Sequence, residues 1–153
     1  MTSSAGGPGA RPAGVGAGNG GGRAIVAGHG EFATGLISAV EQITGRTDVF
    51  VALSIRSLGG EEIERALRDR LLESGANVVF TDLPAGSCTI AARRVLRDRP
   101  DLVLVTGANL PSLLDFVFHS AEPAADAAQH ATDKGRSALV MVGGVGRGAG
   151  GGR

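Results

Sequence analysis

The chain of 153 residues has little of several features that would assign it to a class at once. It has one cysteine, Cys88, which excludes an internal disulfide and fits a reducing compartment. Its 15 basic and 15 acidic residues cancel, so no excess of charge draws it to nucleic acid. It has no apolar run long enough to span a membrane and no apolar signal-peptide core near its N-terminus. These absences predict a soluble, cytoplasmic protein.

Large apolar residues are also scarce in two glycine-rich segments, at residues 1–22 and 143–153. Such segments cannot bury enough surface to offset the entropy cost of ordering, so we expect both to be disordered. The arginines in the second segment fit a solvated tail better than a contact with nucleic acid or an anionic surface. The residues between the two segments, 23–142, have the size of one compact domain.

Short apolar runs alternate with amphipathic segments across residues 23–142. The runs predict strands at 23–28, 49–53, 77–82, 101–105 and 137–142, and the other segments predict helices at 31–44, 60–74, 87–97, 111–119 and 123–135. Because the strands are apolar throughout, the sheet should be covered by helices on both faces. The pattern therefore predicts an α/β fold, doubly wound, with a mostly parallel sheet in the order 2-1-3-4.

The most informative segment runs from Ala24 to Phe32, where an apolar strand stops at His29 and a helix follows at once. This arrangement places an imidazole beside the unpaired N–H groups of a helix N-terminus, which favour an anion. The segment therefore suggests phosphoryl chemistry. It also satisfies the loose dinucleotide fingerprint G-x-G-x-x-G/A, but no carboxylate follows the next strand to bind a ribose. A structural histidine in a tight turn is the other alternative.

Three polar side chains are expected to converge at one crevice. Ligands of doubly wound sheets bind beyond the carboxyl ends of the strands, where the winding direction reverses. With strands 23–28 and 77–82 adjacent, His29, Asp82 and Ser87 all lie at that edge. Asp82 alone fits a turn cap and Ser87 alone fits a helix N-cap. An imidazole, a carboxylate and a hydroxyl at one crevice together predict a reactive site.

The other candidate residues are weaker. His119 lies near a predicted helix end, where a histidine is favourable through the helix dipole. His130 lies on an alanine-rich helix with no evident partner. Cys88 lies at a helix start, which favours a thiolate, but it has no histidine beside it in the sequence. We therefore expect none of the three to carry the chemistry.

Three motifs together carry a family resemblance. They are Ile25–Ala33 (IVAGHGEFA), Val79–Leu83 (VFTDL) with Gly86-Ser87 beyond it, and Gly107–Leu114 (GANLPSLL). In order and spacing, residues 23–142 resemble the enzyme IIA component of the mannose family, which belongs to the bacterial phosphoenolpyruvate-dependent sugar phosphotransferase system. After the strand at 77–82 that family has Gly-Gly-Ser-Pro and then an asparagine, whereas this chain has Ala85-Gly-Ser-Cys-Thr89. The departure bears on partner docking more than on the chemistry.

The resemblance implies a phosphotransferase that needs no metal or cofactor. His29 would accept a phosphoryl group from the phosphorylated histidine-containing phosphocarrier protein and pass it to a IIB component for sugar uptake. Asp82 would accept a hydrogen bond from the other ring nitrogen, and Ser87 and backbone N–H groups from Gly30 onward would hold the phosphoryl oxygens. A regulatory or ligand-sensing module and the phosphotransfer subunit of a dihydroxyacetone kinase remain as alternatives. The membrane components IIC and IID select the sugar, so it cannot be read from this chain.

The resemblance also implies a homodimer. Members of the mannose family exchange a final strand, which pairs antiparallel at the edge of the partner's sheet. We expect residues 137–142 to be this strand, because their apolar side chains and unpaired backbone groups would be costly in water. Exchange of identical elements gives a closed two-fold dimer.

Overall fold

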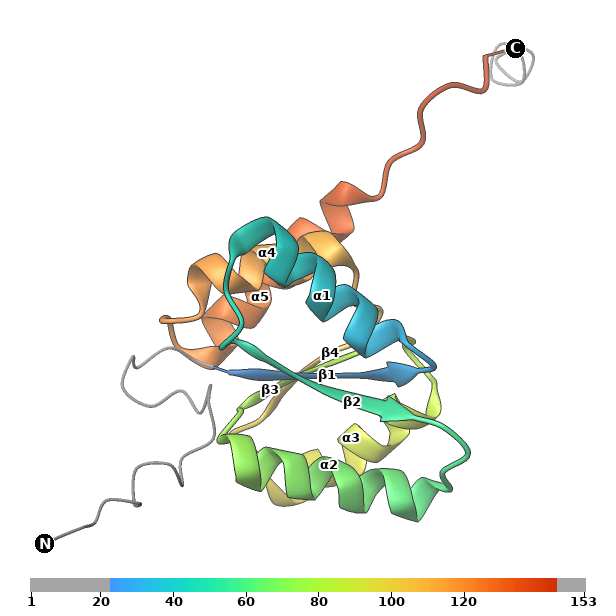
Figure 1. Ribbon diagram of the computed structural model, residues 1–153, viewed down its shortest axis with the longest axis vertical. Coiled ribbons are helices and arrows are strands. Elements are labelled where there is room, and N and C mark those ends of the chain that lie inside the picture. The colour runs from blue at the N-terminus through green and yellow to red at the C-terminus, as the bar shows by residue number, and fades with distance from the viewer. Residues whose placement is uncertain (1–22, 146–153) are drawn as a thin grey trace, which may run out of the picture.

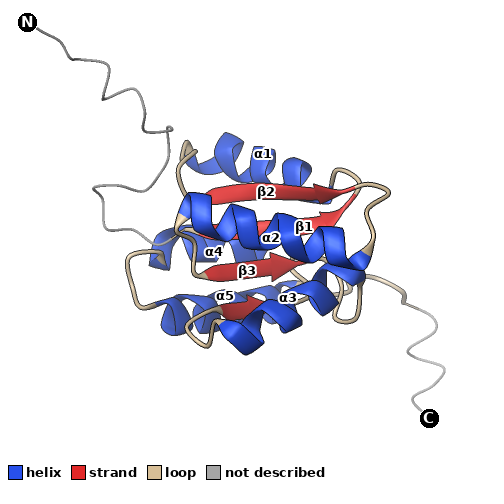
Figure 2. Cartoon of the chain, turned by 90° about the horizontal axis from the view of Figure 1, so that it is seen from below, coloured by secondary structure: helices blue, strands red, loops and turns tan. Residues whose placement is uncertain are grey.

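Four parallel strands form the centre of the structure, and helices cover both of their faces (Figure 1). The computed structural model describes residues 23–145, so the predicted tails lie outside the described residues except for 143–145. The strands are β1 (Ala24–His29), β2 (Phe50–Ile55), β3 (Val78–Thr81) and β4 (Val103–Val105). They lie in the order β2-β1-β3-β4, which Figure 2 shows from the side of α2 and α3. The predicted fold class and strand order are confirmed.

The helices divide into two layers. They are α1 (Phe32–Thr44), α2 (Gly60–Ser74), α3 (Ser87–Asp98), α4 (Leu110–His119) and α5 (Ala124–Ala138). Helices α1, α4 and α5 cover one face of the sheet, and α2 and α3 cover the other (Figure 1). No helix within residues 23–145 is long and apolar enough to cross a bilayer.

Burial on both faces holds β1 in place up to the residue where the candidate site begins. Ala24 and Val26 pack against the layer of α1, α4 and α5, and Ile25 and Ala27 pack against α2 and α3. All four are almost completely buried, whereas His29 at the end of the strand is exposed. A central strand buried on both faces is a rigid support for a side chain at its carboxyl end.

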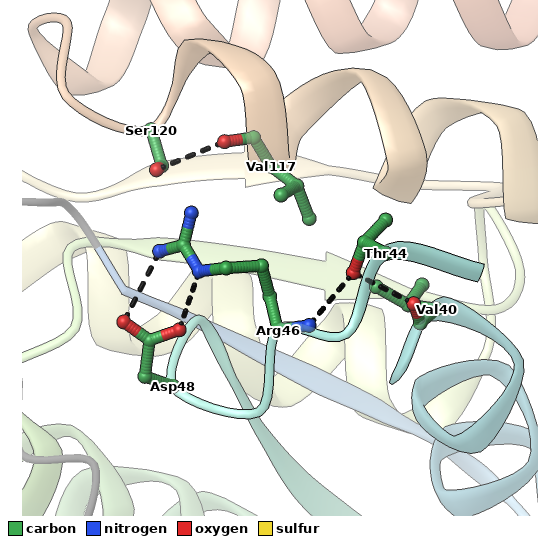
Figure 3. Close-up of polar contacts among 6 residues, drawn as sticks. All are labelled: Val40, Thr44, Arg46, Asp48, Val117 and Ser120. Atoms are coloured by element: carbon green, nitrogen blue, oxygen red, sulfur yellow. Dashed lines mark hydrogen bonds and ion pairs between the residues drawn. The ribbon is translucent and has the colours of Figure 1, made fainter. Parts of the chain in front are cut away.

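Polar contacts hold the loop between α1 and β2, beside the starts of the strands (Figure 3). Gly45 ends α1 with a left-handed backbone, φ 76°. The Thr44 hydroxyl donates to the Val40 carbonyl at 2.8 Å and accepts from the Arg46 backbone N–H at 3.0 Å. The Arg46 guanidinium pairs with both oxygens of Asp48, at 2.8 and 3.1 Å. These contacts serve the fold, at the edge of the sheet opposite His29.

The predicted strand at 137–142 has the wrong bounds. Helix α5 continues through Gly135 and includes Ser137 and Ala138. A Cβ on Gly135 would lie 3.0 Å from both Asn109 Oδ1 and Ser112 Cβ. Gly135 therefore allows α5 to approach α4 closely, and it does not end the helix as the sequence suggested.

The residues after α5 form no strand within the described chain. Residues 139–145 lead away from the body of the molecule (Figure 1). The side chains of Leu139 to Val142 are 72–91% exposed. The described sheet ends at β4, so residues 23–145 of one chain contain no antiparallel edge strand.

Candidate functional site

Two glycines explain why β1 stops at His29 and α1 begins so soon after it. A Cβ on Gly28 would lie 2.5 Å from Phe32 Cδ2 and 3.0 Å from Asp82 Oδ2. Gly28 therefore lets the first residue of α1 and the Asp82 carboxylate approach the strand backbone. Gly30 has φ 54°, the left-handed conformation that glycine adopts without a steric cost, and it makes the turn into α1.

The His29 ring contacts the Asp82 carboxylate. His29 Nδ1 lies 2.7 Å from Asp82 Oδ2, and the same oxygen accepts the His29 backbone N–H at 2.9 Å. Because a carboxylate only accepts hydrogen bonds, Nδ1 carries the proton and Nε2 keeps its lone pair. The His29 side chain is 54% exposed, whereas that of Asp82 is 10% exposed. A buried carboxylate thus orients an open imidazole.

The electrostatics of Asp82 favour positive charge on the ring. Burial is the largest single influence on Asp82, and it raises the pKa of the carboxyl. His29 outweighs burial through the hydrogen bonds from its ring and backbone and through the charge of the ring. The pKa of Asp82 therefore lies below its ordinary value. Asp82 Oδ1 is buried and has no hydrogen-bond partner among the described residues. The ionised carboxylate is therefore directed mainly at His29.

Two helix N-termini meet at this imidazole. Helix α1 starts three residues after His29, and the N-cap of α3 is Gly86, where a Cβ would lie 3.6 Å from His29 Cε1. Neither helix has a side-chain cap. By contrast, the Asn109 side chain caps α4 and the Glu62 carboxylate accepts the Gly59 N–H at α2. Uncapped N–H groups and the positive end of the helix dipole attract an anion.

The remaining predicted site residues lie at the same edge. Gly30 is exposed in the turn between β1 and α1. Ser87 is the half-buried first residue of α3 and follows Gly86, where an added Cβ would meet the ring. The N-cap of α3 is Gly86, so the alternative role of Ser87 as an N-cap is wrong.

Sequence reasoning missed the bracing role of Thr89. Its hydroxyl lies 2.6 Å from that of Thr81 and also donates to the Leu83 carbonyl, and both threonines are fully buried. These contacts join α3 to the chain on either side of Asp82. The signal in the sequence was the departure from the family motif after Ser87, because this chain has Cys88 and Thr89 in place of the proline and asparagine pattern of the family.

Sequence reasoning also passed over Arg56, which follows β2 directly. Ile55 is paired in register with His29, so Arg56 lies at the same edge of the sheet. Its guanidinium is 3.6 Å from the Glu31 carboxylate, and both side chains are exposed. The signal in this case was a cation one residue beyond the neighbouring strand.

Among the weaker candidates, Cys88 is unreactive as a nucleophile, and His119 and His130 lie apart from this crevice. Cys88 is buried, and burial together with the Asp82 charge raises the pKa of its thiol to about 11. It is therefore a thiol at neutral pH, in agreement with its exclusion as a nucleophile. His119 and His130 contact each other, at the end of α4 and on α5. The structure thus gives His130 a partner that the sequence did not indicate.

Fold and site together define a doubly wound domain with an exposed, carboxylate-bound histidine between two helix N-termini. The chain belongs to the mannose-type IIA family of the sugar phosphotransferase system, since the family described as "PTS system fructose IIA component" matches residues 23–133. Proteins of this family are phosphotransferases. No match was found among curated proteins.

Solved structures agree with this assignment. The mannose/sorbose-specific IIA subunit from Enterococcus faecalis is 23% identical, with a TM-score of 0.70 over 80% of this chain and 96% of that one. A phosphotransferase component EIIA from Streptococcus agalactiae is 22% identical, with a TM-score of 0.71 over 78% and 95%. A IIA protein associated with the fucose utilization operon of Streptococcus pneumoniae is 25% identical, with a TM-score of 0.66 over 79% and 93%. At these identities the first two establish a shared fold.

Proposed function

We propose that this chain relays a phosphoryl group through His29 Nε2. The lone pair of Nε2 attacks the phosphorus of a phosphohistidine on the phosphocarrier protein. As the new P–N bond forms, the old one breaks and its electron pair returns to the donor imidazole. The phosphoryl group then passes by the same exchange to a IIB component. The observation that carries this proposal is the hydrogen bond between His29 Nδ1 and Asp82 Oδ2, which leaves Nε2 as the nucleophile.

Asp82 would act during the transfer itself. When Nε2 shares its lone pair with phosphorus, the ring becomes positive, because Nδ1 keeps its proton. The Asp82 charge at 2.7 Å stabilises that positive ring more than the neutral one. The buried carboxylate therefore lowers the barrier and does not merely set the ring orientation.

The phosphoryl oxygens would be held by backbone N–H groups. The uncapped starts of α1 and α3 supply donors from Gly30 onward and near Ser87, and the Ser87 hydroxyl adds one more. Phosphoryl transfer needs chiefly positioning and charge stabilisation, which such donors provide. With these partners the relay would work in the cytoplasm and would meet the membrane only indirectly, through the IIC and IID components.

We propose further that the chain acts as a homodimer with exchanged C-terminal strands. Strand β4 pairs only with β3 among the described strands, and a groove of about 520 Å³ lies along it, lined in part by Leu104, Gly135 and Leu139. The exposed apolar residues 139–142 start beside this groove. Antiparallel pairing of this segment with β4 of a second copy would satisfy both unpaired backbones.

A reconstituted relay tests the function. Phosphoenolpyruvate, enzyme I and the phosphocarrier protein should together phosphorylate the full chain, and added IIB from the same cell should remove the phosphoryl group. Phosphorylation with no transfer to any IIB would favour the regulatory module, and transfer only to a dihydroxyacetone kinase would favour that alternative. No phosphorylation at all would overturn the relay.

A further inference from the structure

A second cluster of chemically active side chains lies at the turn between α4 and α5. His119 is the last residue of α4, Glu122 lies in the connecting turn, and His130 lies in the second turn of α5. Glu122 Oε2 is 3.9 Å from His119 Nε2, and Glu122 Oε1 is 3.6 Å from His130 Nε2. One donor atom from each residue can be chosen so that all three lie within 4.8 Å of one another.

The His119 ring is already set for coordination through Nε2. Its Nδ1 donates to the Asp115 carbonyl oxygen at 3.0 Å, and Asp115 Oδ2 lies 3.2 Å from the same nitrogen. That carboxylate oxygen is buried and accepts no hydrogen bond from any described residue. With the proton on Nδ1, the lone pair is on Nε2, which faces Glu122. A metal-binding histidine commonly donates its second N–H to a carboxylate or carbonyl in this manner.

The two helices hold these residues at a fixed spacing. Helices α4 and α5 make the most extensive contact between any two elements and lie side by side (Figure 1). The small buried side chains Ala127 and Ala131 flank His130 on α5 and allow this approach. At the far end of the pair, Asn109 Nδ2 donates to the Gly135 carbonyl at 3.0 Å. The imidazoles of His119 and His130 are stacked, with centroids 4.1 Å apart and planes 12° from parallel.

We propose that His119, Glu122 and His130 bind one divalent ion of the zinc class. Two imidazoles and one carboxylate suit Zn²⁺ or Co²⁺ better than Mg²⁺ or Ca²⁺, which prefer oxygen ligands alone. Ligand atoms of a tetrahedral zinc ion lie about 3.4 Å apart, given bonds of about 2.1 Å. The separations of 3.6 and 3.9 Å involve different oxygens of Glu122, and one donor atom from each of the three residues lies within 4.8 Å of the others. The three ligands therefore need to close by at most about 1.4 Å.

Ion binding would change the histidine stack in a defined way. Parallel rings direct their lone pairs side by side, so they cannot both point at one ion while stacked. His130, at 53% exposure, is freer to turn than His119, at 27%, which Asp115 holds. Coordination should therefore rotate the His130 ring, and water should complete the tetrahedron. The bound ion would link α4 to α5.

This site is separate from the phosphoryl relay. Helix α4 follows the carboxyl end of β4 and runs back along the sheet, so His119 lies toward the edge where the strands begin. His29 lies at the opposite edge, where β1 ends. The ion should stabilise the fold without changing transfer through His29.

Calorimetric titration of Zn²⁺ into the untagged, chelator-washed full chain tests the proposal. The chain has three histidines, which makes a matched set of variants possible. We expect one ion per chain and a higher Tm with Zn²⁺. His130→Ala should weaken binding more than about a hundredfold and Asp115→Asn about tenfold, because loss of an outer partner alone costs about 10- to 100-fold. His29→Ala should bind as the parent chain does.

Cobalt supplies an independent readout of the ligand set. Four-coordinate Co²⁺ absorbs visible light strongly, so the full chain should become coloured with one equivalent, and Glu122→Gln should abolish the band while its circular dichroism stays unchanged. No saturable Zn²⁺ heat in the parent chain would overturn the proposal. Binding that survives in His130→Ala and Glu122→Gln, or that is lost in His29→Ala, would also overturn it.

Discussion

Replacing Asp82 with asparagine removes a charge while keeping the side-chain shape, which isolates the electrostatic part of its proposed role. In the transfer, positive charge develops on the His29 ring, whose Nδ1 lies 2.7 Å from the carboxylate. Between charge centres about 4 Å apart, with an effective dielectric constant of about 20, a full charge gains about 4 kcal/mol and half a charge about 2 kcal/mol. At about 1.4 kcal/mol per tenfold in rate, Asp82→Asn should slow transfer on the order of a hundredfold.

The assay is a single turnover from the phosphorylated phosphocarrier protein, measured by rapid quenching. Asp115→Asn is the matched control, because Asp115 is also a shielded carboxylate beside a histidine but lies on α4, one turn before the helix ends. That variant should transfer at the parent rate. A folded Asp82→Asn protein that transfers within about threefold of the parent would refute the reasoning and leave Asp82 as a turn residue.

Three further predictions concern the frame around the site and the proposed dimer. Gly28→Ala should abolish phosphorylation and lower the Tm, because the new Cβ would lie 2.5 Å from the Phe32 ring. The control Gly35→Ala places a Cβ with nothing within 4 Å, so it should keep the phosphorylation and the Tm of the parent chain. Equal behaviour of the two variants would contradict this prediction. Thr89→Val should lower the free energy of unfolding, measured with denaturant, by about 1–3 kcal/mol, because it leaves buried hydrogen-bonding groups without a partner. An unfolding midpoint equal to that of the parent chain would contradict the bracing role. Truncation after Ala138 should convert a dimer to monomer or aggregate in light scattering, and truncation after Gly143 should not; a monomeric full-length chain would refute strand exchange.

The layered fold was predictable from the sequence because its elements are locally consistent. Apolar strands and amphipathic helices alternate, and the observed bounds agree with the expected ones within two residues, apart from the end of α5 and the final strand. Parallel order then brings the ends of β1 and β3 together, which predicts that His29 and Asp82 lie at one edge. The family resemblance implied the hydrogen bond between them, and the structure shows that it depends on the close backbone approach that Gly28 permits.

The C-terminal part was harder to predict because tertiary packing decides it. Gly135 looks like a helix stop in the sequence, but close contact with Asn109 and Ser112 explains it within a continuous helix. An apolar segment such as 139–142 has the same pattern whether it pairs within its own sheet or with another copy. The contact of His119 with His130 crosses a turn between two helices, so no helical periodicity reveals it.

The central claim is that His29 is the residue that carries the phosphoryl group. The most direct test is to incubate the full chain with labelled phosphoenolpyruvate, enzyme I and the phosphocarrier protein, and to map the label. The account predicts an acid-labile, alkali-stable phosphate on His29 Nε2 that is absent from His29→Ala and retained in His119→Ala and His130→Ala. A labelled His29→Ala protein would contradict it.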